Sequence, residues 1–266
     1  MIRSIRKVYQ FIKDRPFKKD EIIEGRYRVL ELIGTGSYGM VYHCKDLIEN
    51  DNKVIKQLRP SKSRNKKEIE LFEQEISVMR TLNHNRMPKV YDSFLINNNR
   101  FYVMEFIDGF NLNDQIFNQN ISYNEKQSLL LILKILELVD ELHQSDMYHL
   151  DLRLPNIVMK EARPHLIDFG LVKSDPDKRQ SRKITHGNSM TLKQQDFFDL
   201  GDILLYLLYT TYTKENKKAL PWTEELSLEN ETVYLLKRLL GLNEKYSTSD
   251  EIKADIQEAL KAISSS

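Results

Sequence analysis

The sequence predicts a bilobal α+β fold: a five-stranded antiparallel sheet with one main helix, followed by a mostly helical lobe. Two observations predict it. Residues 27–106 consist mainly of short runs rich in β-branched and aromatic residues, separated by turn residues. From residue 109 onward, long segments place apolar residues three and four positions apart. The change falls at residues 107–109, which we expect to form a hinge between the two lobes.

The elements of the first lobe follow from these patterns. Between the third and fourth strands, one segment has apolar residues on a single helical face, which predicts a helix over residues 66–82. Three consecutive asparagines at residues 97–99 predict the turn between the last two strands. The five strands are expected at residues 27–33, 40–45, 53–56, 90–96 and 101–106.

The second lobe is expected to contain two long helices, at residues 122–144 and 196–209. Between them, the short apolar runs 156–159 and 164–167 flank a charged turn, which predicts a β-hairpin. The chain is thus divided into an N-terminal extension (1–25), a β-rich lobe (26–107) and an α-rich lobe (108–266).

Composition places the chain among soluble globular proteins. Its 266 residues are 41% hydrophobic, which is enough for a sizeable core, and no stretch approaches the ~20 apolar residues that span a bilayer. The 40 basic and 39 acidic residues nearly cancel, so no overall field attracts nucleic acid, and no nucleic-acid partner is expected. A single cysteine, Cys44, excludes internal disulfides and agrees with a reducing, cytoplasmic compartment.

The N-terminal segment, residues 1–19, is strongly basic, with seven lysines and arginines against the single acid Asp14. Apolar residues are interleaved with these charges, which predicts a basic amphipathic helix that ends near Pro16. Such a helix would contact an anionic membrane surface or a partner, or would dock on its own domain with a solvated basic face.

The strongest chemical signal lies at the predicted hairpin. Asp151 precedes the first strand of the hairpin, Asn156 is the first residue of that strand, and Asp168 directly follows the second strand. One carboxylate can orient a hydroxyl nucleophile, whereas an amide oxygen and a second carboxylate are hard ligands suited to Mg²⁺ with a nucleotide triphosphate. This spacing predicts a phosphoryl-transfer centre.

A glycine-rich turn in the first lobe supports the same chemistry. Gly34, Gly36 and Gly39 form a G-x-G-x-x-G pattern that dinucleotide-binding proteins also carry. A strand follows here in place of the helix that a dinucleotide site needs, so a hairpin over phosphates fits better. Lys56 ends the third strand, and Glu75 lies at the edge of the helical apolar face, where it would pair with Lys56.

In this set of motifs the chain resembles the eukaryotic-like (Hanks-type) protein kinases, from about residue 27 to residue 208. The resemblance implies the protein-kinase fold, with Asp151 as the catalytic base and Asn156 and Asp168 as Mg²⁺ ligands. It implies that Lys56, paired with Glu75, binds the phosphates under the glycine-rich loop. Adenine would lie in an apolar sandwich against the hinge, and Asp196 would anchor the catalytic loop. The implied nucleotide-binding residues are Ile33, Gly34, Gly36, Gly39, Val41, Val54, Lys56, Met104, Glu105, Ile107 and Val158.

The chain departs from the family pattern at four places. Leu150 stands where most members carry an arginine that pairs with an activation-loop phosphate, and Arg153 replaces a lysine, which keeps a cation near the γ-phosphate. No Ala-Pro-Glu follows segment 171–195, and Tyr246 lies in the stretch that supplies the partner arginine. The stretch 209–232 is short and polar. Activation and substrate docking are therefore expected to differ from the family.

These residues predict an ATP- and Mg²⁺-dependent protein kinase that phosphorylates protein hydroxyls, with serine or threonine favoured, and is active without activation-loop phosphorylation. It would resemble compact soluble bacterial serine/threonine kinases. Two alternatives remain: a pseudokinase scaffold that only binds nucleotide, and a small-molecule kinase of the aminoglycoside or choline type.

Overall fold

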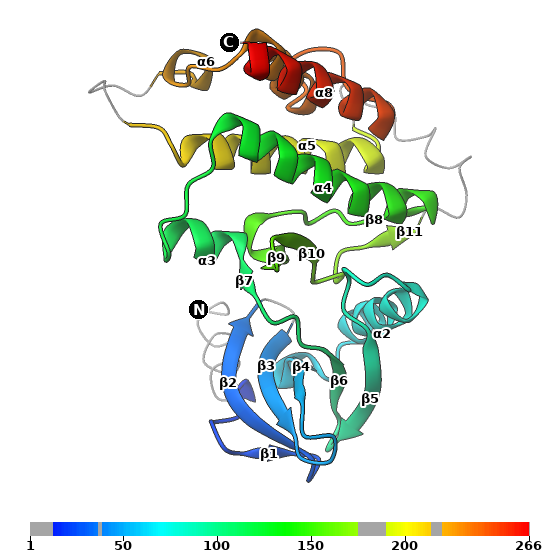
Figure 1. The fold of residues 1–266 in the computed structure, drawn as a ribbon. Helices are drawn as coiled ribbons and strands as arrows, with labels where there is room; N and C mark the ends of the chain where they lie inside the picture. Colours follow the sequence, from blue (N-terminus) through cyan, green and yellow to red (C-terminus); the bar gives the residue numbers. More distant parts are fainter. Residues whose placement is uncertain (1–12, 37–38, 175–189, 214–219, 266) are drawn as a thin grey trace, which may run out of the picture. The chain divides into compact units, whose positions relative to one another are not determined.

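The computed structural model describes residues 13–36, 39–174, 190–213 and 220–265. The chain forms two compact units that divide between Asp108 and Gly109, close to the predicted hinge (Figure 1). Each unit has its own secondary structure and core. The first holds most of the β-structure, and the second holds most of the helices, as the α+β prediction requires.

The first unit is built on one antiparallel sheet with strand order β1-β2-β3-β4-β6-β5. All five predicted strands are present, and the predicted helix forms as α2 (Lys66–Thr81). A sixth strand, β1, was not predicted, because a two-residue strand is too short to show an alternating pattern. The strands are β1 (Ile22–Ile23), β2 (Tyr27–Thr35), β3 (Gly39–Asp46), β4 (Asn52–Leu58), β5 (Val90–Ile96) and β6 (Asn99–Glu105).

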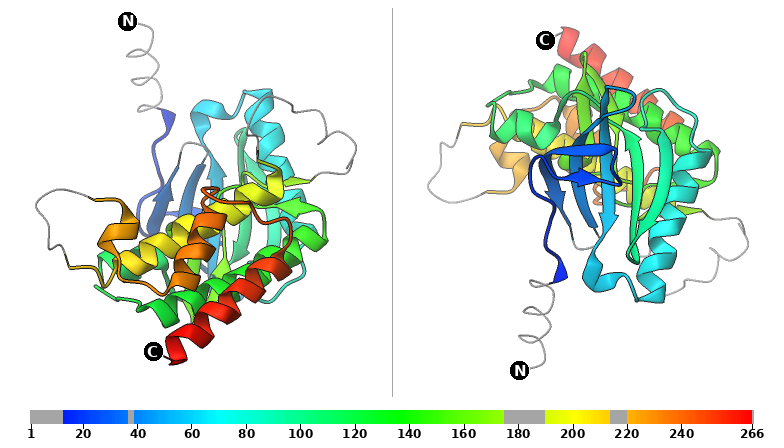
Figure 2. Two further views of the ribbon diagram at one scale, coloured as in Figure 1. Left: turned by 90° about the horizontal axis from the view of Figure 1, so that it is seen from above. Right: turned by 90° about the horizontal axis from the view of Figure 1, so that it is seen from below.

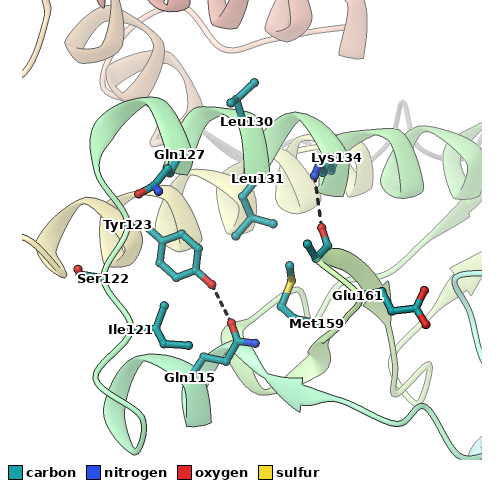
Figure 3. A pocket seen from close by; sticks show the side chains of 11 residues that line it. Gln115, Ile121, Ser122, Tyr123, Gln127, Leu130, Leu131, Lys134, Met159 and Glu161 are labelled. Atoms are coloured by element: carbon teal, nitrogen blue, oxygen red, sulfur yellow. Dashed lines mark hydrogen bonds between the residues drawn. The ribbon is translucent and has the colours of Figure 1, made fainter.

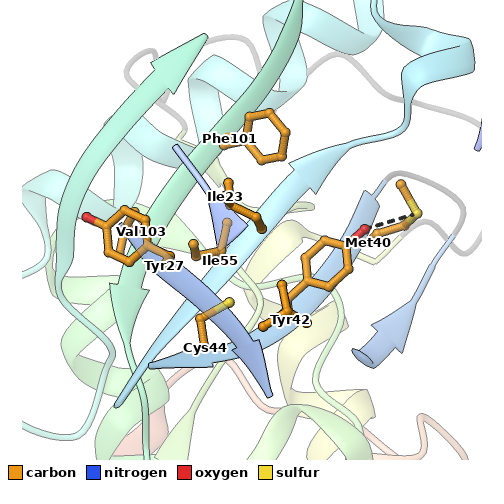
Figure 4. Close-up of a cluster of buried hydrophobic side chains, with 9 residues drawn as sticks. Ile23, Tyr27, Met40, Tyr42, Cys44, Ile55, Phe101 and Val103 are labelled. Carbon is orange, nitrogen blue, oxygen red and sulfur yellow. Dashed lines mark hydrogen bonds between the residues drawn. The ribbon is translucent and has the colours of Figure 1, made fainter. Parts of the chain in front are cut away.

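Alternation along β3 determines which face of this sheet forms the core. Tyr42 and Cys44 are completely buried, whereas Val41 and His43, which alternate with them, point to the opposite face and are only partly buried. The buried face forms a cluster of aromatic and aliphatic side chains (Figure 4). The opposite face is thus left to carry functional side chains. The cluster consists of Ile23, Tyr27, Val29, Met40, Tyr42, Cys44, Ile55, Phe101 and Val103.

Part of the expected N-terminal extension belongs to the sheet itself. Phe17 packs against this core, with its ring 5.7 Å from that of Tyr42, and its backbone N–H donates to the Tyr42 hydroxyl (3.3 Å). Ile23 is buried, and β1 pairs with β2. Phe17 and Ile23 of the expected extension 1–25 therefore pack on the first unit, while the boundary at residue 25 stays a prediction. The expected amphipathic helix, and with it membrane or partner contact through residues 1–19, stays a prediction because residues 1–12 lie outside the described residues.

The second unit surrounds its hairpin with helices. The long helices α4 and α5 lie side by side, with α8 packed on α4 and α7 on α5 (Figures 1 and 2). Its helices are α3 (Leu112–Phe117), α4 (Glu125–Gln144), α5 (Leu192–Tyr209), α6 (Trp222–Glu225), α7 (Asn230–Leu239) and α8 (Ser249–Ser265). Its strands are β7 (Phe110–Asn111), β8 (Met147–Tyr148), β9 (Ile157–Lys160), β10 (Arg163–Leu166) and β11 (Lys173–Ser174), with the 3₁₀ turn η2 (Leu154–Asn156) before β9.

Caps account for the small differences between predicted and observed helix ends. Asn124 and Gln127 form a reciprocal capping box, so α4 begins three residues after the predicted start. Thr191 and Gln194 form a second one, which starts α5 four residues before the predicted start. At Gly201 a Cβ atom would lie 2.7 Å from the Leu239 Cβ, so glycine is what lets α5 approach α7 this closely.

Candidate active site

The first unit presents four of the predicted nucleotide-binding side chains on one face of its sheet. Strand pairing sets Val41 opposite Lys56 and Val54 opposite Met104, and directly opposed residues point to the same face of a sheet. Lys56 lies two residues after Val54, so it shares that face as well. This is the face that the buried core leaves open. Exposure varies along it, from the buried Val54 and Lys56 to the partly buried Val41 and Met104.

The predicted ion pair between Lys56 and Glu75 forms inside the first unit. The Lys56 Nζ lies 2.6 Å from the Glu75 Oε1, and Glu75 is buried on the inner face of α2. The Tyr102 hydroxyl donates to the same oxygen at 3.0 Å. A buried carboxylate needs such partners, since an unpaired one costs several kcal/mol of desolvation. Tyr102 was missed in the sequence, although it stands directly opposite Lys56 in the β4–β6 pairing.

Packing within the chain requires glycine at some positions of the loop and not at others. A Cβ on Gly39 would lie 2.8 Å from the Gln57 carbonyl oxygen, so this glycine is required by the close approach of β4. A Cβ on Gly36 would meet nothing within 4 Å, and one on Gly34 only the Val41 side chain at 3.6 Å. The chain's own packing therefore does not require glycine at the first two positions. A ligand that approaches the backbone would require it.

The other predicted nucleotide contacts lie outside this face, near the ends of strands or in the second unit. Ile33 is 47% exposed at the end of β2, and Ile107 is buried beside the unit boundary. The Glu105 backbone N–H donates to the Lys89 carbonyl, which ties the end of β6 to the segment before β5. Val158, the other predicted sandwich residue, belongs to the second unit and is buried in β9.

The second unit brings the predicted base and the predicted metal ligand together. The Asn156 side-chain nitrogen donates to both the backbone carbonyl and the carboxylate of Asp151, each at 2.9 Å. The Asn156 backbone carbonyl accepts from the Ile167 N–H, which places the residue before Asp168 beside it. Because its nitrogen is engaged with Asp151, the Asn156 amide offers its oxygen as a ligand. Arg153 is exposed directly before η2.

Asp168 lies two residues after the end of β10. It is exposed, whereas the next residue is buried. Phe169 is 1% exposed and its ring lies 5.3 Å from that of His149, so the segment is anchored by an aromatic contact. Asp168 and Leu150 both adopt left-handed backbone conformations, with φ of 62° and 60°. Such conformations cost about 1 kcal/mol or more in residues with a side chain and cluster at functional sites.

Asp196 anchors the backbone of the catalytic loop through hydrogen bonds. It is completely buried, and its carboxylate accepts from the backbone N–H groups of His149 (3.0 Å) and Leu150 (2.7 Å). The His143 Nε2 lies 2.8 Å from the same carboxylate. The anchor implied by the resemblance is therefore in place. His143 was not predicted as its partner, although it lies on the last turn of the predicted helix.

Comparison with known proteins identifies the family. The model of the protein kinase domain matches residues 27–263. The chain belongs to the protein kinase family. It is 38% identical to the probable serine/threonine-protein kinase YbdM of Bacillus subtilis (strain 168), over 98% of this chain and 99% of that protein. It is 24% identical to the serine/threonine-protein kinase PrkC of the same organism, of which it spans only 41%.

The fold comparison agrees with the family. The crystal structure of the Mycobacterium tuberculosis PknI kinase domain matches with a TM-score of 0.67 at 18% identity, covering 92% of this chain and all of that one. At this identity the likeness shows the fold alone. The first and second units are thus the N-lobe and C-lobe of the kinase fold. Within the described residues, no helix has the length and apolar character needed to cross a membrane.

Burial perturbs two titratable groups around the kinase catalytic loop. It lowers the pKa of His149, although the surrounding carboxylates of Asp196, Asp168 and Asp151 act in the opposite direction. In α5, burial raises the pKa of Asp199 to about 6, while hydrogen bonds from the Gln195 side chain and the Leu152 backbone lower it in part. Sequence patterns gave no signal for Asp199. Its contact with Leu152 places it directly under the catalytic loop.

Replacing Asp199 by asparagine is expected to stabilise the kinase at neutral pH. The native pKa of this carboxyl lies above the 3.8 of an unperturbed aspartate, so the folded state holds the proton more tightly. Its contribution to stability therefore falls as the pH rises from about 4 to about 6. After discounting for its partial exposure, we expect a gain of about 1 kcal/mol at pH 7.5, shrinking toward pH 5. Urea unfolding at both pH values tests this, and a gain that grows on acidification would contradict it.

A buried cluster of aromatic and charged side chains forms around Tyr246. This tyrosine is buried and its hydroxyl donates to Asp255 at 2.5 Å. The Arg238 guanidinium lies 3.8 Å from the centre of the Tyr246 ring and pairs with both Asp255 and Glu251. The Gln194 side chain donates to the Tyr246 carbonyl, which links this cluster to the start of α5. An aromatic and charged network thus joins α7, α8 and the start of α5.

A pocket in the C-lobe lies apart from these residues (Figure 3). It is formed by α4, the segment before it, α3 and the turn between β9 and β10. The Tyr123 hydroxyl donates to Gln115 (2.8 Å), and Lys134 donates to the Ala162 carbonyl (3.3 Å). Its lining contains none of the predicted catalytic, metal-binding or nucleotide-binding residues.

Proposed function

We propose that this protein is a serine/threonine protein kinase that transfers the γ-phosphate of ATP, bound with Mg²⁺, to a hydroxyl group of a protein substrate. The observation that carries the proposal is the hydrogen-bonded pair of Asp151 and Asn156 in a chain of the kinase family. The identity to YbdM over nearly its whole length supports the serine/threonine class, because that protein is named as one.

The residues of the N-lobe fit a nucleotide triphosphate. Lys56, held by Glu75, supplies a positive charge for phosphate oxygens, and the loop glycines let backbone N–H groups approach them. Val41, Val54 and Met104 offer an apolar surface for the base, and Ile33 and Ile107 of the same lobe would extend it. The contact of Val158 with the base stays a prediction from the resemblance. Glu105 and Ile107 would contribute backbone groups for adenine.

The residues of the C-lobe fit the metal and the chemistry. The Asn156 oxygen and the Asp168 carboxylate are hard donors of the kind that Mg²⁺ prefers. When bound, the ion would neutralise phosphate charge. Asp151 orients the substrate hydroxyl and accepts its proton as the new O–P bond forms and the bond to the ADP leaving group breaks. Arg153 would hold a cation near the γ-phosphate, with a planar fork of donors.

The two alternatives from the sequence are not favoured. A pseudokinase would not need the complete set of Lys56, Glu75, Asp151, Asn156 and Asp168, and the Lys56–Glu75 pair is formed. A small-molecule kinase fits poorly with the identity to YbdM over the whole chain, since that protein is named as a protein kinase.

Transfer of labelled phosphate tests the proposal. With Mg²⁺-ATP and a generic protein substrate, we expect label on serine or threonine after acid hydrolysis, and no transfer when EDTA removes the metal. Label confined to tyrosine would overturn the serine/threonine assignment. Transfer to small hydroxyl compounds but not to proteins would overturn the protein-kinase assignment.

Activity is expected to be independent of phosphorylation in the activation segment. Leu150 has an apolar side chain at the position from which most family members pair an arginine with a phosphate, and only its backbone is anchored, through Asp196. Phosphatase treatment should therefore change the rate by less than about twofold. The comparison needs mass spectrometry to show that the phosphate was removed. A loss of most of the activity on dephosphorylation would show that another cation takes the place of the arginine.

A further inference from the structure

We propose that Asp14 and Arg59 are positioning residues for ATP, because they tether the glycine-rich loop to the N-terminal segment through the Gly36 carbonyl. The inference rests on the proposed use of that loop for nucleotide binding. It extends the site to a part of the chain that precedes the kinase-domain match at residue 27.

Arg59 provides the direct contact with the loop. It follows the last residue of β4, and its Nε donates to the Gly36 carbonyl oxygen at 2.8 Å. A trans peptide unit carries its C=O and N–H on opposite sides, so a donor that holds the carbonyl fixes the orientation of that whole unit. The Gly36 N–H donates to the Gly39 carbonyl at 3.0 Å, which closes the turn from inside. Arg59 adds a restraint from outside.

Asp14 in turn fixes Arg59. The Arg59 Nη1 lies 3.1 Å from the Asp14 Oδ2, and the Asp14 side chain is only 3% exposed. The same carboxylate accepts from the Ser61 backbone N–H (2.8 Å) and hydroxyl (2.9 Å). Because a buried carboxylate is stable only with such partners, its position is narrowly defined. The planar guanidinium can therefore bridge Asp14 and Gly36 in one arrangement.

The N-terminal segment itself is anchored on the sheet. Phe17, three residues after Asp14, packs its ring against Tyr42 and Phe101, and its N–H donates to the Tyr42 hydroxyl. These are core residues of the N-lobe. The tether therefore connects the loop to the buried core of the sheet, through the segment from Phe17 to Asp14 and the contacts of Arg59 with Asp14 and Gly36.

Such a tether reduces the conformational entropy that the glycine-rich loop loses when ATP binds. A glycine has access to many backbone conformations, and the space beside the Gly36 Cα leaves room for them, because a Cβ built there would meet no atom within 4 Å. Holding one conformation before the ligand arrives raises affinity without a new contact to the ligand. The expected signature is a change in ATP affinity, with little change in the rate of the chemical step.

The test measures ATP affinity by calorimetry with Mg²⁺-ATP, alongside KM and kcat. Arg59→Gln is expected to weaken ATP binding about fivefold, the size of effect that one ordinary hydrogen bond has, and to leave kcat within about twofold. Arg59→Lys should retain the ion pair to Asp14 and the melting temperature, yet lose ATP affinity, because one ammonium cannot reproduce the fork. The double variant Asp14→Asn/Arg59→Gln should bind ATP no more weakly than Arg59→Gln alone, since the two residues act in one chain.

Arg100→Gln is the matched control. Arg100 is about as exposed as Arg59, and its guanidinium pairs with Glu73 in the same lobe. Its ATP affinity should equal that of the wild type. An unchanged affinity in Arg59→Gln, or a loss equal to that of the control, would overturn the inference. Wild-type protein that binds ATP but transfers no phosphate would refute the proposed function while the affinity comparison still stands.

Discussion

Replacing Asp151 by asparagine is expected to lower kcat about 10³-fold while ATP affinity stays unchanged. Proton transfer by a positioned carboxylate contributes about 10² to 10⁴ in rate, and an amide cannot accept that proton. The change is nearly isosteric, and the Asn156 nitrogen also donates to the Asp151 backbone carbonyl, a contact that the variant keeps. The loss should therefore appear in the chemical step alone. Phosphate transfer to protein and calorimetric titration with Mg²⁺-ATP measure the two quantities separately.

Asp250→Asn is the control for that variant. Asp250 is an aspartate of the same lobe whose side chain is 89% exposed and pairs only weakly with Lys253 at 3.4 Å. Its kcat should match the wild type. If Asp151→Asn retained more than about a tenth of the wild-type kcat, Asp151 would be excluded as the proton acceptor. A loss of less than about tenfold is far smaller than the contribution of a positioned proton acceptor. The phosphate transfer would then have to be assigned to other residues.

Replacing Asp196 by alanine is expected to destabilise the C-lobe by about 3 to 5 kcal/mol, the range found when one partner of a buried charged network is removed. The carboxylate is completely buried and satisfies the backbone N–H groups of His149 and Leu150. Alanine would leave both groups without their acceptor in the interior, and each such group costs about 1 to 3 kcal/mol. Catalysis should fall as well, because these N–H groups position the loop that carries Asp151.

Urea unfolding measures this loss, and two further variants distinguish its cause. Asp196→Asn keeps one acceptor oxygen and should cost less than alanine. His143→Ala/Asp196→Ala should cost less than the sum of the single changes, because the His143 Nε2 and the Asp196 carboxylate are partners at 2.8 Å. Additive losses would mean that His143 and Asp196 are not coupled. If Asp196→Ala lowered the free energy of unfolding by less than about 1 kcal/mol, water would have to reach the backbone N–H groups of His149 and Leu150 in the variant.

Much of the fold was predictable because its signals are local. Five strands and the helix α2 were recognised from alternation and from a three-and-four spacing, which depend only on neighbouring residues. The Lys56–Glu75 pair was also predicted, since a glutamate on the edge of an apolar face needs a charged partner. The sequence did not predict the two-residue strand β1 or the exact starts of α4 and α5, which capping boxes set. A short strand and a cap are recognised from contacts rather than from periodicity.

The missed residues share one property: their role depends on chain segments far apart in the sequence. Tyr102 reaches Glu75 only because β6 pairs with β4, and His143 reaches Asp196 only because α4 packs on α5. Asp199 acquires its raised pKa from burial under the catalytic loop. No local pattern carries this information, since hydrogen bonding and desolvation are set by distance in space.

The sequence by itself was enough to predict the family, which the comparisons confirm. Motif spacing along the chain also gave the proposed roles of Asp151 in orienting the nucleophile and of Asn156 and Asp168 as metal ligands. The tertiary structure decided what supports that chemistry. It placed Asp196 under the loop, Tyr102 behind the ion pair and Arg59 against Gly36. The physical reason is that catalytic groups must lie at short, fixed intervals on connected turns, whereas their supports need only meet them in the folded interior.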